Sequence, residues 1–290
     1  MSGGMTGVLA GPDPADLKRV VATALEEDLR YGPDATTAAT VPADAVAVAA
    51  FAAREPGVLA GLPAVRAVLD EVVGGYEVIE SRSDGDRLAA GDVALLVRAP
   101  VRGLLTAERT ALNLLCHLSG VATATAAWVD AVAGTGARIR DTRKTLPGLR
   151  LLEKYAVRCG GGVNHRLGLG DAILIKDNHV AAAGSVGAAL AAARAARPDL
   201  PYEVEVDTLD QLDEVLALGA ELVLLDNFDV ERTREAVRRR GERPTKLESS
   251  GGLTLDTARA YAETGVDYLS VGALTHSVRA LDLGLDLRPA

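Results

Sequence analysis

Residues 202–227, YEVEVDTLDQLDEVLALGAELVLLDN, decide the fold. A short apolar run over 202–206 is followed by a segment over 208–218 whose apolar residues recur at helical spacing. A second short apolar run follows over 222–225. Strand, helix and strand at this spacing predict a crossover that joins two parallel strands.

The same rhythm extends to both sides of that stretch. Strands are expected at 138–140, 172–175, 202–206, 222–225, 246–247 and 268–271. Helices are expected at 149–158, 185–197, 208–218, 230–240 and 254–263. Six such units favour an α/β fold, either an incomplete β/α barrel or an open doubly wound sheet. No Gly-x-Gly-x-x-Gly follows a strand and opens a helix, which lowers the case for dinucleotide binding.

The first hundred residues have a different pattern. Residues 1–12 are Gly-rich and are expected to be loose. Asp13 and Pro14 are typical of the start of a helix, here predicted to end near residue 29. A helix over 63–73 and strands over 46–51, 76–83 and 93–99 complete an α+β layer. A long helical segment over 103–132 follows, with a break expected near Ser119-Gly120.

Composition excludes several classes of protein. The chain has 290 residues and a formal net charge of −9, from 31 Lys and Arg against 40 Asp and Glu. This excess of acid argues against a nucleic-acid-binding protein, which needs a basic face. No apolar run reaches 18 residues and the N-terminus resembles no secretory signal, so we expect no membrane association. Two cysteines make neither a disulfide framework nor a zinc site, which favours the cytoplasm.

The charge is distributed unevenly along the chain. Residues 138–176 carry nine Lys and Arg against three Asp and Glu, a local excess of six positive charges. The chain has only five lysines, and two of them, Lys144 and Lys176, follow the first two expected strands of the series. Arg150, Lys154 and Arg158 repeat at every fourth residue of a predicted helix, and we expect them to form a solvated face.

In a β/α barrel the active site lies where the strands end. Here all six strand ends carry polar residues or glycine: 141–144, 176–179, 205–207, 226–227, 248–252 and 272–273. Strand ends are commonly polar because the chain leaves the core there, and that interpretation is the alternative for each residue alone. The glycine-rich loops after the last two strands predict a phosphate site, because glycine lets backbone N–H groups approach.

The cations at these ends need an anionic partner. Arg143, Lys144, His165, Arg166 and Lys176 would repel one another unless a polyanion is bound. Glu205 and Asp226 end adjacent strands and would either hold a divalent metal ion or neutralise these cations, and both roles stay open.

Several motifs resemble quinolinate phosphoribosyltransferase, also called nicotinate-nucleotide pyrophosphorylase (carboxylating). They are Glu108-Arg-Thr-Ala-Leu-Asn113, His117-Leu-Ser-Gly120, Asp141-Thr-Arg-Lys-Thr-Leu-Pro-Gly148, Cys159-Gly-Gly-Gly-Val-Asn-His-Arg166, Leu174-Ile-Lys-Asp-Asn-His179, Glu203-Val-Glu-Val-Asp207, Leu225-Asp-Asn227 and Glu248-Ser-Ser-Gly-Gly252. The resemblance covers residues 20–285. It implies an N-terminal α+β sandwich domain over 1–118, with the tail 275–290 packed near it. It also implies a β/α barrel of six to seven strands over 119–274, and a homodimer.

The resemblance further implies an activity and its site. The family joins quinolinate to phosphoribosyl pyrophosphate with Mg²⁺ and releases pyrophosphate and CO₂, giving nicotinate mononucleotide for NAD biosynthesis. By resemblance, Lys144, Lys176, Glu205 and Asp226 are catalytic, and Glu205 and Asp226 also hold the metal. The implied substrate contacts are Arg54, Arg109, Thr142, Arg143, Lys144, His165, Arg166, Lys176, Glu205, Asp226, Ser250, Gly251, Gly252, Val271, Gly272 and Ala273.

Individual roles follow from the same resemblance. The two carboxylates of quinolinate would be held by Arg143, His165, Arg166 and Lys176, with Lys144 beside the pyrophosphate. The 5′-phosphate would lie against the loops at 250–252 and 271–273. Arg109, and with less support Arg54, would reach in from the partner subunit of the dimer.

Three other functions compete with this one. A Schiff-base lyase would use Lys176 as its nucleophile. A related phosphoribosyltransferase would act on another aromatic acid. A non-enzymatic scaffold would only bind a phosphate ligand.

Overall fold

The structure is a computed structural model that describes residues 9–289, so most of the predicted loose segment 1–12 lies outside the described residues. The chain divides into two compact units. The first contains the residues up to 126, then 145–161 and everything from 274 onward, and the second contains 127–144 and 162–273. The domain limit expected after residue 118 falls within one continuous helix, and the segment 145–161 joins the first unit rather than the barrel.

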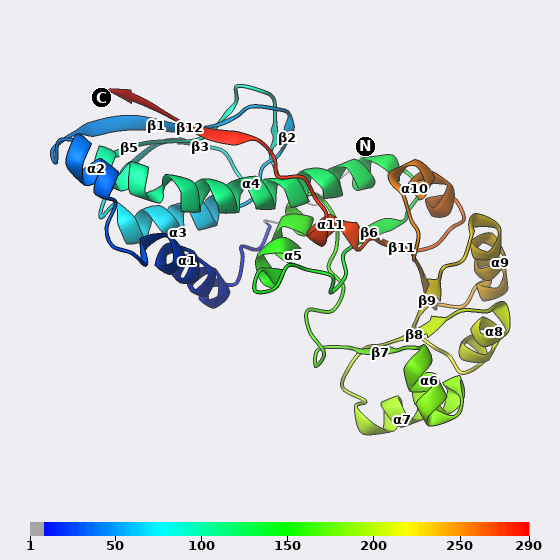
Figure 1. Cartoon of the computed structure of the whole chain (residues 1–290). Coiled ribbons are helices and arrows are strands. Elements are labelled where there is room, and N and C mark those ends of the chain that lie inside the picture. The colour runs from blue at the N-terminus through cyan, green and yellow to red at the C-terminus, as the bar shows by residue number, and fades with distance from the viewer. Residues whose placement is uncertain (1–8, 290) are drawn as a thin grey trace. The chain divides into compact units, whose positions relative to one another are not determined.

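The first unit contains an antiparallel sheet with the strand order β12-β1-β5-β3 (Figure 1). Its strands are β1 (Val46–Ala53), β3 (Glu77–Ser81), β5 (Val93–Pro100) and β12 (Leu283–Pro289). The C-terminal strand β12 pairs with β1 along its whole length, which ties the end of the chain to this unit. Two further short strands, β2 (Gly57–Val58) and β4 (Arg87–Leu88), pair with each other.

Helices cover one side of this sheet (Figure 1). The helices of the first unit are α1 (Pro14–Leu29), α2 (Ala35–Thr40), α3 (Leu62–Val72), α4 (Val101–Ala131), which reaches into the second unit, α5 (Arg150–Cys159) and α11 (Ala273–His276). As predicted, the Asp13 side chain caps α1 by accepting the Asp16 N–H at 2.8 Å. Lys154 on α5 is 1% exposed, so the solvated face predicted for that helix is wrong at this position.

Helix α4 runs unbroken through Ser119-Gly120, so the predicted break is wrong. A Cβ atom on Gly120 would lie 2.3 Å from the carbonyl oxygen of Arg279, so the glycine allows a close approach of the chain. The Ser119 hydroxyl donates to the Ala60 carbonyl oxygen at 3.0 Å and accepts the Ala60 N–H. Helix α4 is also long and apolar enough to cross a membrane, but 61% of its apolar stretch is buried, as in the core helix of a globular protein.

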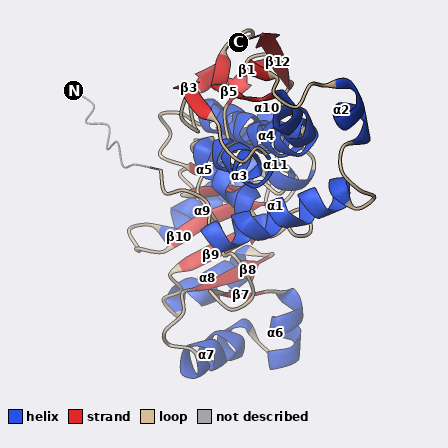
Figure 2. Ribbon diagram, turned by 90° about the vertical axis from the view of Figure 1, so that its left-hand side faces the viewer, coloured by secondary structure: helices blue, strands red, loops and turns tan. Residues whose placement is uncertain are grey.

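The second unit contains a six-stranded parallel sheet with the order β6-β11-β10-β9-β8-β7. Figure 2 labels the part of this sheet from β10 to β7. Its strands are β6 (Arg138–Arg140), β7 (Ile173–Ile175), β8 (Tyr202–Val206), β9 (Leu222–Asp226), β10 (Lys246–Ser250) and β11 (Tyr268–Ser270). Its helices are α6 (Asp177–Ala183), α7 (Val186–Ala196), α8 (Leu209–Ala217), α9 (Val230–Arg240) and α10 (Leu255–Ala262). Every predicted strand of the series is present, whereas α6 was not predicted.

The strand order decides between the two folds that the sequence left open. Strands that follow one another in the chain are neighbours from β7 to β11, and β11 returns to pair with the first strand, β6. A doubly wound sheet instead reverses its strand order at a switch point. Only β6 and β7 stay apart, and there Val163 makes a single parallel bridge to Arg140. The incomplete β/α barrel is therefore confirmed.

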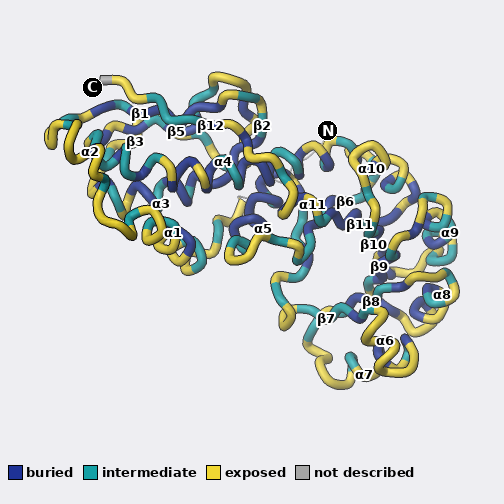
Figure 3. Tube along the Cα trace, in the orientation of Figure 1, coloured by how far each residue is buried: buried dark blue, intermediate teal, exposed yellow. Residues whose placement is uncertain are grey.

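The two faces of the barrel sheet differ in polarity along β8 and β10. Val204, Val223 and Leu247 are each 0% exposed, and Figure 3 shows buried stretches along these strands. The alternate positions of β8 and β10 carry charged or hydroxyl groups, among them Glu203 and Glu248, whereas those of β9 are Leu222, Leu224 and Asp226. Because side chains alternate along a strand, the apolar set builds the core and leaves the polar set around the barrel axis.

A Gly120→Ala substitution tests the packing of α4. Alanine favours a helix interior by about 1 kcal/mol, but overpacking against the 279–280 backbone costs about 1–3 kcal/mol. We therefore expect a net loss of up to about 2 kcal/mol in the free energy of unfolding, measured in urea. Gly170→Ala, where an added Cβ meets nothing within 4 Å, is the control. Equal unfolding curves for both variants would contradict the close approach.

Candidate active site

A cavity of about 370 Å³ opens where the barrel strands end. All of its walls come from the second unit. The lining residues are Thr142, Arg143, Lys144, His165, Arg166, Leu174, Lys176, Glu205, Leu224, Asp226, Glu248, Ser250 and Ser270. Four of these side chains are Lys or Arg and three are Asp or Glu, so the cavity is rich in charge of both signs and has an excess of cations.

Nine of the sequence-predicted site residues line this cavity: Thr142, Arg143, Lys144, His165, Arg166, Lys176, Glu205, Asp226 and Ser250. Gly251, Gly252, Val271, Gly272 and Ala273 follow β10 and β11 but are not among the lining residues. Arg54 and Arg109 belong to the first unit, where Arg54 pairs with Asp286 at 2.7 Å and Arg109 pairs with Glu108 at 2.8 Å. Their contribution to a neighbouring subunit stays a prediction.

The loop after β10 contacts Asn227, which follows β9. The Asn227 N–H donates to the Ser250 carbonyl oxygen at 2.9 Å, and Asn227 has a φ of 54°, in the left-handed region. A Cβ atom on Gly251 would lie 2.1 Å from the Asn227 Oδ1 atom, and the φ of Gly251 is +88°. Both the space and the backbone conformation therefore require glycine at 251.

Lys144 lies against the loop after β11. A Cβ atom on Gly272 would lie 2.8 Å from the Lys144 Cδ atom, so the lysine stem packs over this glycine. The Lys144 N–H donates to the Thr142 hydroxyl at 2.9 Å, which shapes the turn after β6. The first and last strands of the barrel thus meet at this side of the cavity.

Glu205 and Asp226 lie in different electrostatic environments. Lys176 forms an ion pair with Glu205 across the cavity wall. Burial, with a smaller contribution from the charge of Asp207, raises the pKa of Asp226 above its usual value, while Lys176 and Lys144 act in the opposite direction. Asp226 also accepts a hydrogen bond from the Asn227 side chain at 2.8 Å. Asp226 is therefore the carboxylate whose charge is less well compensated.

The two arginines of the cavity, Arg143 and Arg166, repel each other electrostatically. Burial, and then the nearby charge of Arg143, lower the pKa of the Arg166 guanidinium below its usual value. A guanidinium stays protonated in proteins, so the shift measures an unfavourable electrostatic environment rather than a loss of charge. An anion placed between the two arginines would relieve that repulsion.

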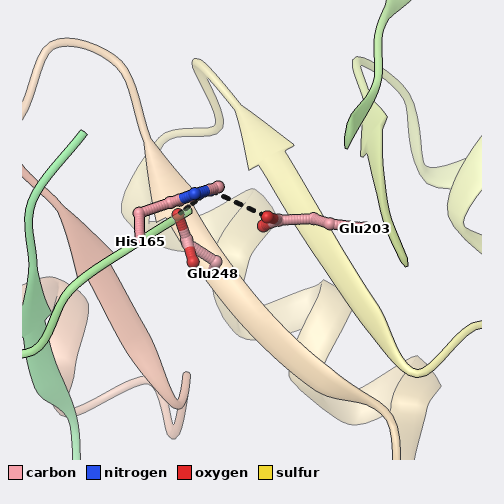
Figure 4. A group of neighbouring side chains, drawn as sticks. All are labelled: His165, Glu203 and Glu248. Carbon is pink, nitrogen blue, oxygen red and sulfur yellow. Dashed lines mark ion pairs between the residues drawn. The ribbon is translucent and has the colours of Figure 1, made fainter. Parts of the chain in front are cut away.

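A charged cluster that the sequence did not predict lies deeper in the barrel and is made by Arg140, His165, Glu203 and Glu248. Figure 4 shows the last three of these side chains. Arg140 forms an ion pair with Glu248, and its Nη1 atom lies 4.0 Å from Glu203 Oε2. The His165 Nε2 atom lies 2.9 Å from Glu203 Oε2 and 3.9 Å from Glu248 Oε1. Ser270 donates to Glu248 from β11.

Burial changes the acidity of this cluster. It raises the pKa of Glu203 from 4.5 to about 7, with Arg140 acting in the opposite direction. Burial, together with the charge of Glu203, also raises the pKa of Glu248. The two carboxylates therefore hold protons more readily than exposed acids do, and they bring less negative charge into the barrel than their number indicates.

The sequence contained a signal for this cluster. Glu203 and Glu205 alternate with valines in β8, and Glu248 and Ser250 alternate with buried residues in β10. Residues two apart point to the same face of a strand. Attention to strand ends alone included Glu205, Glu248 and Ser250, but it gave Glu248 no role and did not include Glu203.

The ligand atoms of His165, Glu203 and Glu248 lie within 4.8 Å of one another, which is compatible with a metal ion. Arg140 already supplies a positive charge to both carboxylates. The 2.9 Å contact between His165 and Glu203 is the length of a hydrogen bond. The cluster is accordingly explained as an ion pair joined to a hydrogen bond, without a metal.

Comparison with known proteins identifies the family. The model of the quinolinate phosphoribosyl transferase N-terminal domain matches residues 34–119, and the model of the C-terminal domain matches residues 121–286. The chain belongs to the quinolinate phosphoribosyltransferase family. The resemblance found in the sequence motifs is thereby confirmed, and the Schiff-base lyase is not supported.

Individual relatives agree with this family. A nicotinate-nucleotide pyrophosphorylase [carboxylating] of Mycobacterium leprae is 67% identical over 91% of this chain and 94% of its own length. A probable nicotinate-nucleotide pyrophosphorylase [carboxylating] of Bacillus subtilis is 44% identical over 82% of this chain and 83% of its own. The solved structure of the nicotinate-nucleotide pyrophosphorylase from Francisella tularensis is 37% identical, covers 98% of this chain and all of its own, and superposes with a TM-score of 0.92.

The raised pKa of Glu203 predicts a pH-dependent stability. The folded protein binds this proton more tightly than the unfolded chain does, so its stabilising effect is present below pH 4.5 and is lost as the pH rises toward 7. Relative to Glu203→Gln, which cannot titrate, the wild type should lose about 1–3 kcal/mol of unfolding free energy between about pH 5 and pH 7.5. Urea unfolding at both pH values measures this. Parallel pH dependence of the two proteins would contradict the assignment.

Proposed function

We infer that this chain is an enzyme that transfers the phosphoribosyl group of phosphoribosyl pyrophosphate to quinolinate. The reaction releases pyrophosphate and CO₂ and gives nicotinate mononucleotide for NAD biosynthesis. Family membership supports this inference, and the observation that carries it for this chain is the cation-rich cavity at the strand ends. Both substrates are polyanions, so a site that holds them together must supply positive charge.

For quinolinate, we propose that Arg143, Arg166, Lys176 and His165 hold the two carboxylates. Arginine binds a carboxylate through two parallel hydrogen bonds and fixes its orientation, whereas lysine acts as a compact point charge. The mutual repulsion of Arg143 and Arg166 supports this role, because a carboxylate between them replaces repulsion with attraction. When the anion binds, the Lys176 ammonium group would interact with it and less closely with Glu205.

For phosphoribosyl pyrophosphate, we propose that the pyrophosphate lies beside Lys144 and that the loops at 250–252 and 271–273 hold the 5′-phosphate. The left-handed backbone at Gly251 and Gly252 supports this proposal, since such a loop can turn successive N–H groups toward an anion. Glu205 and Asp226 are the groups proposed for the ribose hydroxyls.

The same two carboxylates fit Mg²⁺. Oxygen donors are the ligands that Mg²⁺ prefers, and it is commonly held by one or two carboxylates that leave other positions for water and phosphate oxygens. The incompletely compensated charge of Asp226 supports this role for Asp226 and Glu205. When bound, Mg²⁺ would neutralise charge on the pyrophosphate leaving group.

Catalysis then rests on position and charge. We propose a dissociative displacement at the anomeric carbon, in which the acidic pair stabilises positive charge that develops on the sugar. The 2-carboxylate then leaves as CO₂, the positively charged pyridinium ring stabilises the electron pair left on its C2 atom, and a proton from solvent bonds to that carbon. Holding two charged substrates in register supplies much of the rate enhancement, and no enzyme nucleophile is required.

We further propose a homodimer located in the cytoplasm, in which Arg109, and with less support Arg54, reaches the site of the partner subunit. The exposed position of Arg109, whose side chain is 65% accessible, supports its availability for such a contact.

The activity itself is the first test. Quinolinate, phosphoribosyl pyrophosphate and Mg²⁺ should yield CO₂ and nicotinate mononucleotide in equal amounts, and nicotinate should not replace quinolinate. Arg166→Ala should lower kcat/KM for quinolinate by about 100-fold or more, because it removes a bidentate contact from a desolvated site. Arg234→Ala, which removes a surface ion pair on α9, is the control. A near-normal Arg166→Ala enzyme would refute the role of Arg166, and use of nicotinate would refute the substrate.

The metal proposal has its own test. Asp226→Asn should raise the Mg²⁺ concentration that gives half-maximal activity by about tenfold or more, because one anionic ligand is lost. Asp210→Asn, at the exposed start of α8, should leave that concentration unchanged. A Mg²⁺ dependence in Asp226→Asn equal to that of the wild type would count against the site.

Mixing two inactive variants tests the contribution across the dimer. Arg109→Ala and Arg166→Ala each lack one residue, so a mixed dimer would contain one intact site. An equimolar mixture that exchanges subunits should recover about a quarter of wild-type activity, since about half of random dimers are mixed. If subunit exchange is confirmed but activity is not recovered, Arg109 and Arg166 belong to the site of the same subunit, or Arg109 lies outside the site.

A further inference from the structure

His165 is held at three points by groups of the second unit. Its main-chain N–H donates to Asp141 Oδ1 at 2.7 Å. Its ring Nδ1 accepts the main-chain N–H of Arg166 at 2.7 Å. Its ring Nε2 lies 2.9 Å from Glu203 Oε2.

These contacts determine where the ring proton lies. Because Nδ1 accepts a hydrogen bond from a backbone N–H, it carries no proton of its own. A neutral imidazole then has its proton on Nε2, the nitrogen that meets Glu203. A carboxylate oxygen accepts from that N–H whether or not the other oxygen of Glu203 is protonated, so the arrangement survives a change in the charge of Glu203.

Glu203 is itself fixed in place. It is 3% exposed, and its Oε2 atom lies within 4.0 Å of Arg140, which is ion-paired with Glu248. Its other oxygen, Oε1, is buried and makes no hydrogen bond to the residues that the structure describes. The carboxylate therefore meets His165 and Arg140 through the same oxygen, Oε2, and no hydrogen bond to Oε1 from the described part of the chain turns it away.

We propose that Glu203 is a positioning residue of the quinolinate site, which selects the Nε2–H tautomer of His165. This rests on the function proposed above. One consequence follows for the cavity. The Nδ1 lone pair anchors the main chain of Arg166, whose guanidinium is proposed to bind a substrate carboxylate. The ring proton on Nε2 is given to Glu203, so His165 acts on the cavity through Arg166.

The opposite tautomer shows what Glu203 prevents. With the proton on Nδ1, the Arg166 N–H would meet another N–H and lose its acceptor. The Nε2 lone pair would then face the Glu203 carboxylate and any substrate carboxylate near it. A neighbouring acceptor commonly fixes the tautomer of a functional histidine in this way.

The tautomer is directly measurable by ¹⁵N NMR of the imidazole nitrogens. The chain has only four histidines, so His165 can be assigned by replacing the other three. The wild type should show protonated Nε2 and unprotonated Nδ1. Glu203→Gln should keep this pattern because its amide oxygen still accepts, whereas Glu203→Leu should lose it. Protonated Nδ1 in the wild type, or an unchanged pattern in Glu203→Leu, would overturn the proposal.

Steady-state kinetics of the same variants test the consequence for substrate. Glu203→Leu should raise KM for quinolinate about tenfold or more and leave KM for phosphoribosyl pyrophosphate within about twofold. Glu203→Gln should restore the quinolinate KM, which a general loss of packing would not allow. Glu221→Leu, at an exposed carboxylate just before β9, is the matched control.

The proposed function and the proposed tautomer of His165 can be refuted independently of each other. If the wild type does not use quinolinate, the proposed function fails while the NMR pattern still tests the tautomer. If Glu203→Leu does not fold, the wild-type and Glu203→Gln spectra decide the tautomer. Equal rises in both KM values in Glu203→Leu would reduce Glu203 to a structural role and contradict the proposal.

Discussion

The buried ion pair between Arg140 and Glu248 is the interaction on which the arrangement of the site residues in the barrel depends. It places a guanidinium among carboxylates at the centre of a barrel that apolar side chains usually fill. Taking such charges out of water costs about as much as their attraction returns, so a buried pair is weak evidence for stability. Its role is to fix neighbouring side chains in place. Arg140 lies beside Glu203, Glu203 contacts His165, and the His165 ring accepts the main-chain N–H of Arg166.

The balance of charge in the barrel has two layers. Deep in the interior, Arg140 is ion-paired with Glu248, and burial raises the pKa values of Glu203 and Glu248. At the mouth, burial and the charge of Arg143 act against the charged Arg166 guanidinium, whereas Asp171 and Glu203 favour it. Of the nine Lys and Arg in residues 138–176, Arg143, Lys144, Arg166 and Lys176 line the cavity, so the local excess of positive charge contributes to the mouth only in part.

Much of this could be predicted from the sequence, and the failures have physical reasons. Strand and helix periodicity located all six barrel strands, because each apolar face is packed against helices. The long helix was expected to break at Gly120, but that glycine serves a contact with residues 279–280, which local sequence does not show. The site was found where charge follows a strand, whereas Arg140 and Glu203 were given no role because they alternate with apolar residues inside strands. Glu248 was included as a strand-end residue, but its pairing with Arg140 depends on contacts between distant strands.

The central claim is that the charges inside the barrel serve the site rather than the fold. Quinolinate binding to the Arg140→Met/Glu248→Leu double variant, measured by calorimetry beside its urea unfolding, tests this most directly. We predict that the double variant has an unfolding free energy equal to or above that of the wild type, because both partners of the buried pair are removed together. We also predict that its Kd for quinolinate is raised about tenfold or more. Wild-type affinity in the double variant would contradict the account.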